Sequence, residues 1–205
     1  MSAEENQDEQ PGATLRGRTQ DGHGLLARVI PDRRARRLAE WVLLIALALS
    51  AALLLRTFVV QSFYIPSTSM TPTLKVGDRV LVNKLAYRFG DPGRGDIIVF
   101  EAPPGEGNTK IKDLIKRVVG LPGETIEGRD GHVYIDGKAL EEHWLPPGVQ
   151  SRTFGPVEVP EDRYWVLGDN RFDSRDSTFF KSIPRSSIIG KAFVRIWPLG
   201  NLSTL

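Results

Sequence analysis

The chain has 205 residues, of which 40% are hydrophobic, so it is long enough and apolar enough to bury a sizeable core. Its 27 Lys and Arg nearly balance its 25 Asp and Glu, and we therefore expect no nucleic-acid partner. The absence of cysteine excludes disulfides, thiolate metal sites and a cysteine nucleophile.

The first predicted elements are a polar tail and an apolar helix. Residues 1–37 are rich in Glu, Gln, Asp, Gly and Arg without hydrophobic periodicity, which is typical of a disordered tail. The run "WVLLIALALSAALLL" follows at Trp41–Leu55 and is apolar apart from Ser50. Residues 38–60 reach the roughly 20 residues that a transmembrane helix needs, so we predict one there and expect the lipid bilayer as a partner.

Charge at the two ends of this segment predicts its orientation in the cell membrane. Four arginines in "RRARR" precede it, whereas only Arg56 lies near its other end. The positive-inside rule then leaves the N-terminus in the cytoplasm and everything after Gln61 outside. A cleaved secretory signal is the alternative. The long polar stretch before the arginines and the lack of a small-x-small site favour an uncleaved anchor.

After the anchor, the pattern changes to short apolar runs punctuated by Pro and Gly, which is typical of strands. These runs are "DRVLVNKLAY", "GDIIVFEAP", "LIKRVVG", "HVYIDGKAL", "RYWVLG" and "SIIGKAFVRIW". Asp136-Gly137 between two of the apolar stretches predicts a tight hairpin. We therefore predict a mainly β, antiparallel domain over residues 61–205, with the turn-rich stretch 128–160 as a smaller inserted lobe.

The stretch "FYIPSTSMTPTL" places three hydroxyl side chains between two prolines, directly after the anchor. A hydrophilic linker is one interpretation, and a nucleophile is the other, provided that a base is present. His23 lies in the predicted tail, and His132 and His143 flank the turn-rich hairpin, so none is a good base. No His, Asp and Glu set has metal-ligand spacing, so we expect neither a metal nor another cofactor.

Lysine is the remaining candidate for the base. In the predicted strand "DLIKRVVG", Lys116 shares a face with Leu114 and Val118. An ammonium among apolar side chains loses solvation, which lowers its pKa and allows a neutral amine near pH 7. Arg117 on the opposite face has similar neighbours, but a guanidinium cannot act as a base in a protein.

A third polar stretch, "WVLGDNRFDSRDSTFF", follows a hydrophobic strand with a dense run of Asp, Asn, Arg and Ser. Such a loop can satisfy a buried lysine and tie strand ends together through charge-assisted hydrogen bonds. A surface turn of the Asx type is the competing interpretation.

Taken together, "PSTSMTPTL", "GDRVLVNKLAYRFGDPGRGDIIVF", "IKRVVGLPGETI" with "VYIDGK", and "GDNRFDSRDS" resemble the ordered signature motifs of bacterial type I signal peptidases. The resemblance covers roughly residues 62–196. It implies a membrane-bound serine endopeptidase that uses a Ser/Lys dyad to remove signal peptides from exported preproteins, on a mostly β catalytic domain.

By motif position, the resemblance implies a role for each candidate residue. Ser69 is the nucleophile and Lys116 the general base. Ser67 and the Ser69 backbone N–H form the oxyanion hole, and Ser174 orients the lysine amine. The supporting polar residues are Asp169, Arg171, Asp176 and Arg117. The residues expected to line small substrate pockets, which accept an A-x-A pattern, are Ile65, Pro66, Met70, Leu74 and Ile115.

One departure from the family pattern concerns the last motif, which often closes with Asp-Ser-Arg. Here Asp176 and Ser177 are followed by Thr178. The ion pair of that arginine is therefore expected to be absent or supplied by Arg175.

Two rival functions remain open from the sequence. One is a membrane-anchored, non-catalytic β domain that binds exported peptides by strand addition. The other is a Ser/Lys protease that cleaves itself or one client, although such self-cleaving proteases are soluble and the anchor argues against it.

Overall fold

The computed structural model describes residues 33–106 and 112–205. Most of the predicted tail, residues 1–32, lies outside the described residues. Helix α1 spans Arg33–Phe58, so it begins five residues before the predicted segment and takes in the arginine cluster. Residues Arg34–Leu54 of α1 form a candidate membrane span with a mean hydropathy of 1.9. The predicted end of the segment at residue 60 already belongs to a strand, because Val60 pairs with Asn83.

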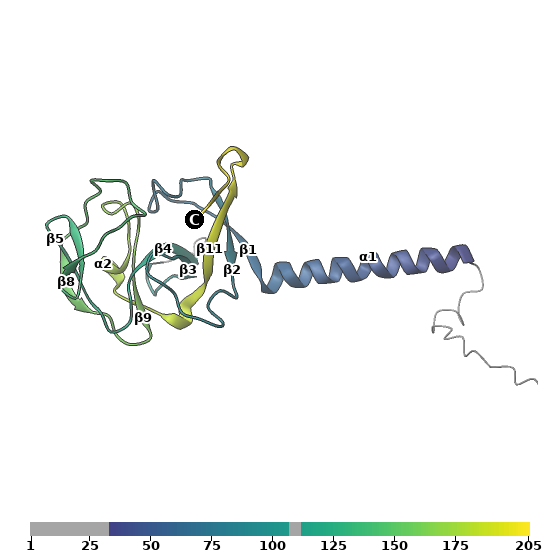
Figure 1. Ribbon diagram of the computed structural model, residues 1–205, viewed down its shortest axis with the longest axis horizontal. Helices are drawn as coiled ribbons and strands as arrows, with labels where there is room; N and C mark the ends of the chain where they lie inside the picture. The colour runs from purple at the N-terminus through teal and green to yellow at the C-terminus, as the bar shows by residue number, and fades with distance from the viewer. Residues whose placement is uncertain (1–32, 107–111) are drawn as a thin grey trace, which may run out of the picture. The chain divides into compact units, whose positions relative to one another are not determined.

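Two antiparallel sheets follow α1, which confirms the predicted mainly β class. The eight-stranded sheet has the order β1-β2-β11-β3-β4-β9-β10, with β12 also paired to β11. Its strands are β1 (Val60–Tyr64), β2 (Arg79–Asn83), β3 (Ile97–Glu101), β4 (Asp113–Gly120), β9 (Arg163–Leu167), β10 (Ile183–Pro184), β11 (Ile188–Trp197) and β12 (Ser203–Thr204). Figure 1 shows β4, β3 and β11 side by side in the middle of this domain.

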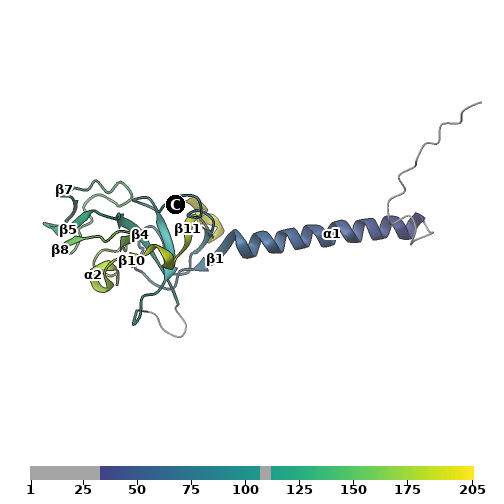
Figure 2. The same cartoon turned by 90° about the horizontal axis from the view of Figure 1, so that it is seen from below.

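The second sheet has four strands in the order β7-β6-β5-β8. They are β5 (Thr125–Arg129), β6 (His132–Ile135), β7 (Lys138–Ala139) and β8 (Phe154–Glu158). In Figures 1 and 2, β5 and β8 lie at the end of the β domain opposite β1. The predicted turn joins β6 to β7, with positive φ at Asp136 and Gly137 as a two-residue hairpin requires.

Helical structure after α1 is confined, in the described residues, to single turns. These are α2 (Ser177–Phe180) and two 3-10 turns, Arg185–Ser187 and Leu199–Asn201. The core divides into three clusters of buried apolar side chains. One cluster, around Ile65, Met70, Leu74 and Val99, supports the turn that carries Ser69.

Candidate active site

Ser69 lies in the turn that joins β1 to β2. The ends of this turn are fastened by two backbone hydrogen bonds, from Ile65 N–H to Asp78 O at 2.9 Å and from Gly77 N–H to Ile65 O at 3.0 Å. Met70 and Leu74 are fully buried and hold the turn against the core. The neighbouring Ser69 is therefore held in place, and it is itself only 7% exposed.

Lys116 lies on β4, between β3 and β9 in the sheet. It is 3% exposed and faces the same side of the strand as Leu114 and Val118, as predicted. Its Nζ lies 2.8 Å from Ser69 Oγ and 3.0 Å from the Ile115 carbonyl oxygen. The fold thus brings the predicted nucleophile and the predicted base into hydrogen-bond contact.

Burial determines the protonation of this lysine. Desolvation lowers the pKa of Lys116 to about 8, and the nearby carboxylates of Asp176 and Asp169 oppose that shift only in part. A substantial fraction of the amine is then neutral at mildly alkaline pH. A neutral amine in contact with a serine hydroxyl can accept its proton, which is the arrangement of an activated nucleophile.

Ser67 lies two residues before Ser69, on the exposed side of the turn. Its Oγ is 3.4 Å from Ser69 Oγ, so its hydroxyl can reach an oxygen atom of a group that Ser69 attacks. It lines the same small cavity as Ser69 and Lys116.

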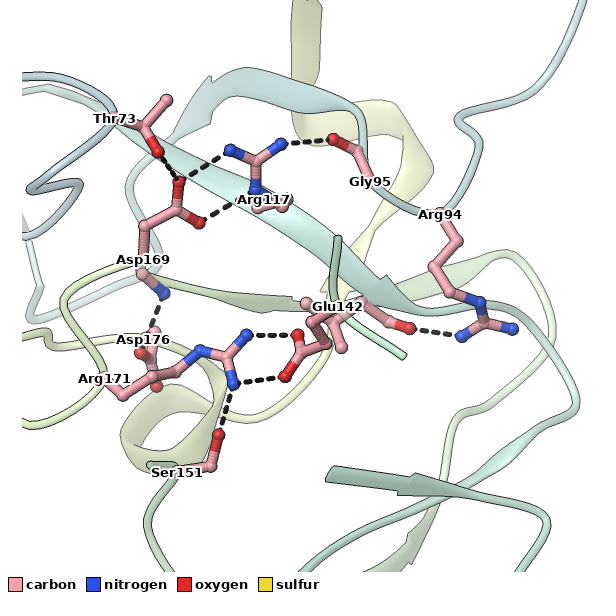
Figure 3. A network of polar contacts seen from close by, with 11 residues as sticks. Thr73, Arg94, Gly95, Arg117, Glu142, Ser151, Asp169, Arg171 and Asp176 are labelled. Carbon is pink, nitrogen blue, oxygen red and sulfur yellow. Dashed lines mark hydrogen bonds and ion pairs between the residues drawn. The ribbon is translucent and has the colours of Figure 1, made fainter. Parts of the chain in front are cut away.

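Asp169 and Arg117 form a buried ion pair beside the site (Figure 3). Arg117 donates from Nε at 2.8 Å and from Nη2 at 2.6 Å to the two carboxylate oxygens of Asp169. Thr73 Oγ1 donates to the same carboxylate at 2.5 Å, and Arg117 also reaches Gly95 O at 2.7 Å. Because Arg117 is part of β4, its two hydrogen bonds to Asp169 fix the start of the loop 168–176 relative to that strand.

Asp176 fixes the other end of that loop. Its carboxylate accepts from Gly168 N–H at 3.0 Å, and from Thr178 N–H at 3.1 Å and Oγ1 at 2.8 Å. Thr178 therefore uses its hydroxyl where the family often has an arginine. Of the two expected outcomes, an absent ion pair or one supplied by Arg175, the described residues show the first, because Arg175 pairs with Glu106 at 2.7 Å instead.

Ser174 does not make the bond that was expected of it. Its Oγ is buried and has no hydrogen-bond partner among the described residues, whereas Lys116 Nζ contacts Ser69 and Ile115. Ser174 nevertheless lines a cavity together with Ser69 and Lys116. It packs so closely on Gly168 that a Cβ there would lie 2.2 Å from Ser174 Oγ and 2.4 Å from Ser69 O, so Gly168 permits this approach.

Arg171 is buried and points toward the connection between β7 and β8 (Figure 3). It donates to both carboxylate oxygens of Glu142, one of them at 2.7 Å, and to Ser151 Oγ. Glu142 and Ser151 were not predicted, because nothing in their local sequence distinguishes them from ordinary loop residues. Only the fold shows that the second sheet's connection holds the loop 168–176.

A small cavity of about 80 Å³ opens beside Ser69 and Lys116. Among its lining residues are three of the predicted pocket residues, Ile65, Pro66 and Ile115. The other two, Met70 and Leu74, are fully buried in the core cluster beneath the turn and do not line this cavity. Their place in a substrate pocket stays a prediction.

The histidines stay away from the site, as far as the structure describes them. His132 and His143 are exposed in the second sheet and its connection. In residues 33–106 and 112–205, no three His, Asp or Glu side chains gather closely enough to hold a metal ion.

Comparison with known proteins identifies the family to which this chain belongs. The family model described as "Signal peptidase, peptidase S26" matches residues 38–197. A signal peptidase I of Leptolyngbya laminosa is 48% identical over 173 residues, covering 82% of this chain and 84% of the relative. A probable signal peptidase I-2 of Synechocystis sp. is 44% identical over 161 residues, covering 77% and 72%.

Among solved structures, a crystal structure of a signal peptidase I from Enterococcus faecalis is 34% identical, with a TM-score of 0.42. It aligns with 49% of this chain and 96% of that one. The family model covers most of the chain, including the Ser69 turn, β4 and the loop 168–176, and the relatives match along most of their own length. The chain therefore belongs to the S26 family of signal peptidases.

Proposed function

We propose that this chain is a membrane-bound serine endopeptidase that removes signal peptides from exported preproteins. The observation that carries the proposal is the 2.8 Å contact between Ser69 Oγ and the buried amine of Lys116, in a chain of this family. A non-catalytic peptide-binding domain would not need a desolvated lysine on a serine hydroxyl. We therefore favour catalysis over the binding alternative.

The reaction follows from the positions of three side chains. Neutral Lys116 takes the proton of Ser69 Oγ as that oxygen attacks the carbonyl carbon of the scissile peptide bond. The Ser67 hydroxyl and the Ser69 N–H donate to the carbonyl oxygen as it becomes negative. The Lys116 ammonium then gives its proton to the leaving nitrogen. The C–N bond breaks and the acyl group stays as an ester on Ser69 Oγ. Water then gives a proton to Lys116 as it attacks the ester carbon, the C–Oγ bond breaks, and Ser69 Oγ takes that proton back from Lys116.

Buried polar contacts around the pair support this role without taking part in it. Asp169 and Arg117 hold the loop 168–176 against β4, and Asp176 closes the loop at its other end. Arg171 ties the loop to the second sheet. We assign all four as positioning residues. We keep Ser174 as a packing residue beside Ser69 rather than a hydrogen-bond partner of the lysine.

The small cavity supports selection for small side chains. Its volume of about 80 Å³ is roughly half that of a ~150 Å³ cavity that holds benzene, which favours a small side chain over an aromatic ring. We propose that Ile65, Pro66 and Ile115 line the site for the residue before the scissile bond. The small residues at the end of export signals match it.

The substrate test compares two forms of one preprotein, with the purified full chain in detergent. A preprotein with Ala immediately before the scissile bond should be cut there, with the site read from the product mass. The same preprotein with Phe at that position should be cut at least tenfold more slowly. Equal cleavage of the two preproteins would show that the small cavity does not bind the residue before the scissile bond.

We further propose that α1 spans the cell membrane, with the N-terminus in the cytoplasm and the β domain outside. The exposed leucines along α1 support a membrane span, and the arginine cluster at its start supports the orientation. Because the chain lacks cysteine, single Ser2→Cys and Ser186→Cys variants can be labelled in intact cells with a membrane-impermeant maleimide. Only Ser186→Cys should react, and labelling of Ser2→Cys alone would reverse the orientation.

A further inference from the structure

A second and larger cavity, of about 340 Å³, opens from the Ser69–Lys116 pair. It shares Ser67, Ser69, Leu114 and Lys116 with the small cavity, and extends from them toward residues 172–175 and Arg152. A peptide bond placed at Ser69 therefore has a cavity for the residues on each of its two sides. The small cavity is assigned above to the signal-peptide side, which leaves the larger one for the other side.

Arg152 gives this larger cavity a fixed positive charge. It is half-buried, and its guanidinium donates to Ser174 O at 2.9 Å and to Phe172 O. The guanidinium also lies 5.0 Å from the ring of Phe179, which packs over it. Carbonyl oxygens and a ring orient Arg152 but do not neutralise it, and none of the ion pairs in the described part of the chain joins it to a carboxylate.

The other charged groups of the cavity differ from Arg152 in this respect. Arg175 is exposed and paired with Glu106 at 2.7 Å, so the two charges cancel locally. Asp173 is exposed at the rim and accepts from Thr68 Oγ1 at 2.7 Å, where water screens its charge. Lys116 must be neutral to act. Arg152 is thus the least screened net charge that an incoming peptide meets.

We propose that the larger cavity binds the first residues after the scissile bond, and that Arg152 makes it select an acidic side chain among them. The inference rests on the proposed function, since it needs a peptide bond at Ser69. The orientation of the Arg152 guanidinium is already fixed, so little conformational entropy is lost when a carboxylate binds to it. The enzyme would then be selective for side chains at the start of the mature protein as well as at the end of the signal peptide.

The test uses peptide substrates that are identical up to the scissile bond and differ at one of the first three positions after it. Each position carries Asp, Asn or Lys in turn. At one position or more, wild-type protein should cleave the Asp peptide with a kcat/KM about threefold to tenfold above that of the Lys peptide. The Asn peptide should fall between them.

Variants test whether the preference for Asp over Lys depends on Arg152. In Arg152→Gln the Asp-to-Lys ratio should fall to about one, whereas Arg152→Lys should retain part of it. Arg88→Gln is the matched control, because Arg88 is exposed and lies outside both cavities, and it should keep the wild-type ratio. The preference for Ala over Phe before the scissile bond should be the same in all variants.

The ratio separates recognition from a structural role. If Arg152→Gln slows every peptide equally and keeps the Asp-to-Lys ratio, Arg152 only holds the loop and the inference is wrong. A ratio of one at all three positions in wild-type protein also overturns it. If wild-type protein cleaves none of the peptides, the proposed function itself has failed.

A measurement on wild-type protein covers the case in which Arg152→Gln does not fold. Raising NaCl from about 0.05 M to about 0.5 M shortens the screening length, so the Asp-to-Lys ratio should shrink toward one. An Asp-to-Lys ratio that does not change with salt would show that the cavity does not select side chains by their charge.

Discussion

Residue chemistry predicted Lys116 as the base, whereas the choice of Ser69 among the three hydroxyls came from its position in the signature motif. A lysine with apolar neighbours on its own face of a strand is unusual, and only the amine, not the Arg117 guanidinium, can lose a proton. Motif position also assigned Met70 and Leu74 to a pocket. In the structure both are fully buried, and a local sequence does not tell which side of an irregular turn faces the core.

Ser67 is the hydroxyl whose role is easiest to test by substitution. If it donates to the oxyanion, it acts mainly in the transition state, where the charge on that oxygen is largest. Ser67→Ala should then lower kcat by about 10²–10³ with KM nearly unchanged.

Ser62→Ala is the matched control, since Ser62 is an exposed serine of β1 outside both cavities and should keep wild-type kcat. Steady-state kinetics on one preprotein serve for both variants. Similar kinetics for Ser67→Ala and Ser62→Ala would leave the Ser69 backbone N–H as the oxyanion donor.

The pH dependence of cleavage tests the lysine. The pKa of Lys116 is lowered to about 8 by burial, so below that pH the amine is protonated and cannot accept the Ser69 proton. The value of kcat/KM should rise about tenfold per pH unit up to about pH 8 and then level off. A profile measured from about pH 6 to about pH 9.5 checks this. A flat profile, or one that falls as pH rises, is inconsistent with a neutral lysine base.

Strands that contain a short apolar run of their own were predictable, and strands without one were not. The runs at β2, β3, β4, β9 and β11 carry Val, Ile or both, and Asp136-Gly137 marks the β6–β7 turn. β1 was missed because its sequence continues the apolar run of α1. β5 and β8 were missed because Gly128, and Gly155 with Pro156, weaken the strand pattern.

The contact between the loop 168–176 and the second sheet makes a separate prediction. Arg171→Met removes the cation that pairs with Glu142, whose side chain is only 13% exposed, and leaves a carboxylate with little access to water. Breaking such a pair should cost about 3 kcal/mol of unfolding free energy.

Arg129→Met is the control, because Arg129 pairs with Glu127 at 3.5 Å with its side chain 45% exposed, and it should cost less than about 1 kcal/mol. Thermal unfolding of the full chain in detergent compares the two variants. Equal shifts in Tm would mean that the Arg171–Glu142 pair does not brace the loop.

The architecture of the chain accounts for its substrate as well as its chemistry. The nucleophile lies on the turn after β1, and β1 follows α1 with one residue between them. A signal peptide is itself a membrane-inserted segment, so its cleavage site emerges close to the bilayer surface. A catalytic serine near the end of an anchor is well placed to meet it, which joins the proposed topology to the proposed reaction.

The most direct test of this account is cleavage of a preprotein by full-length protein in lipid or detergent, with Ser69→Ala, Lys116→Ala and the double variant measured beside wild type. Because the two side chains act as one unit, each single variant should lose nearly all turnover and the double variant should be little worse than either. Wild-type protein should release the mature protein cut after a small residue. Near-normal turnover by Lys116→Ala, or by Ser69→Ala, would contradict the account.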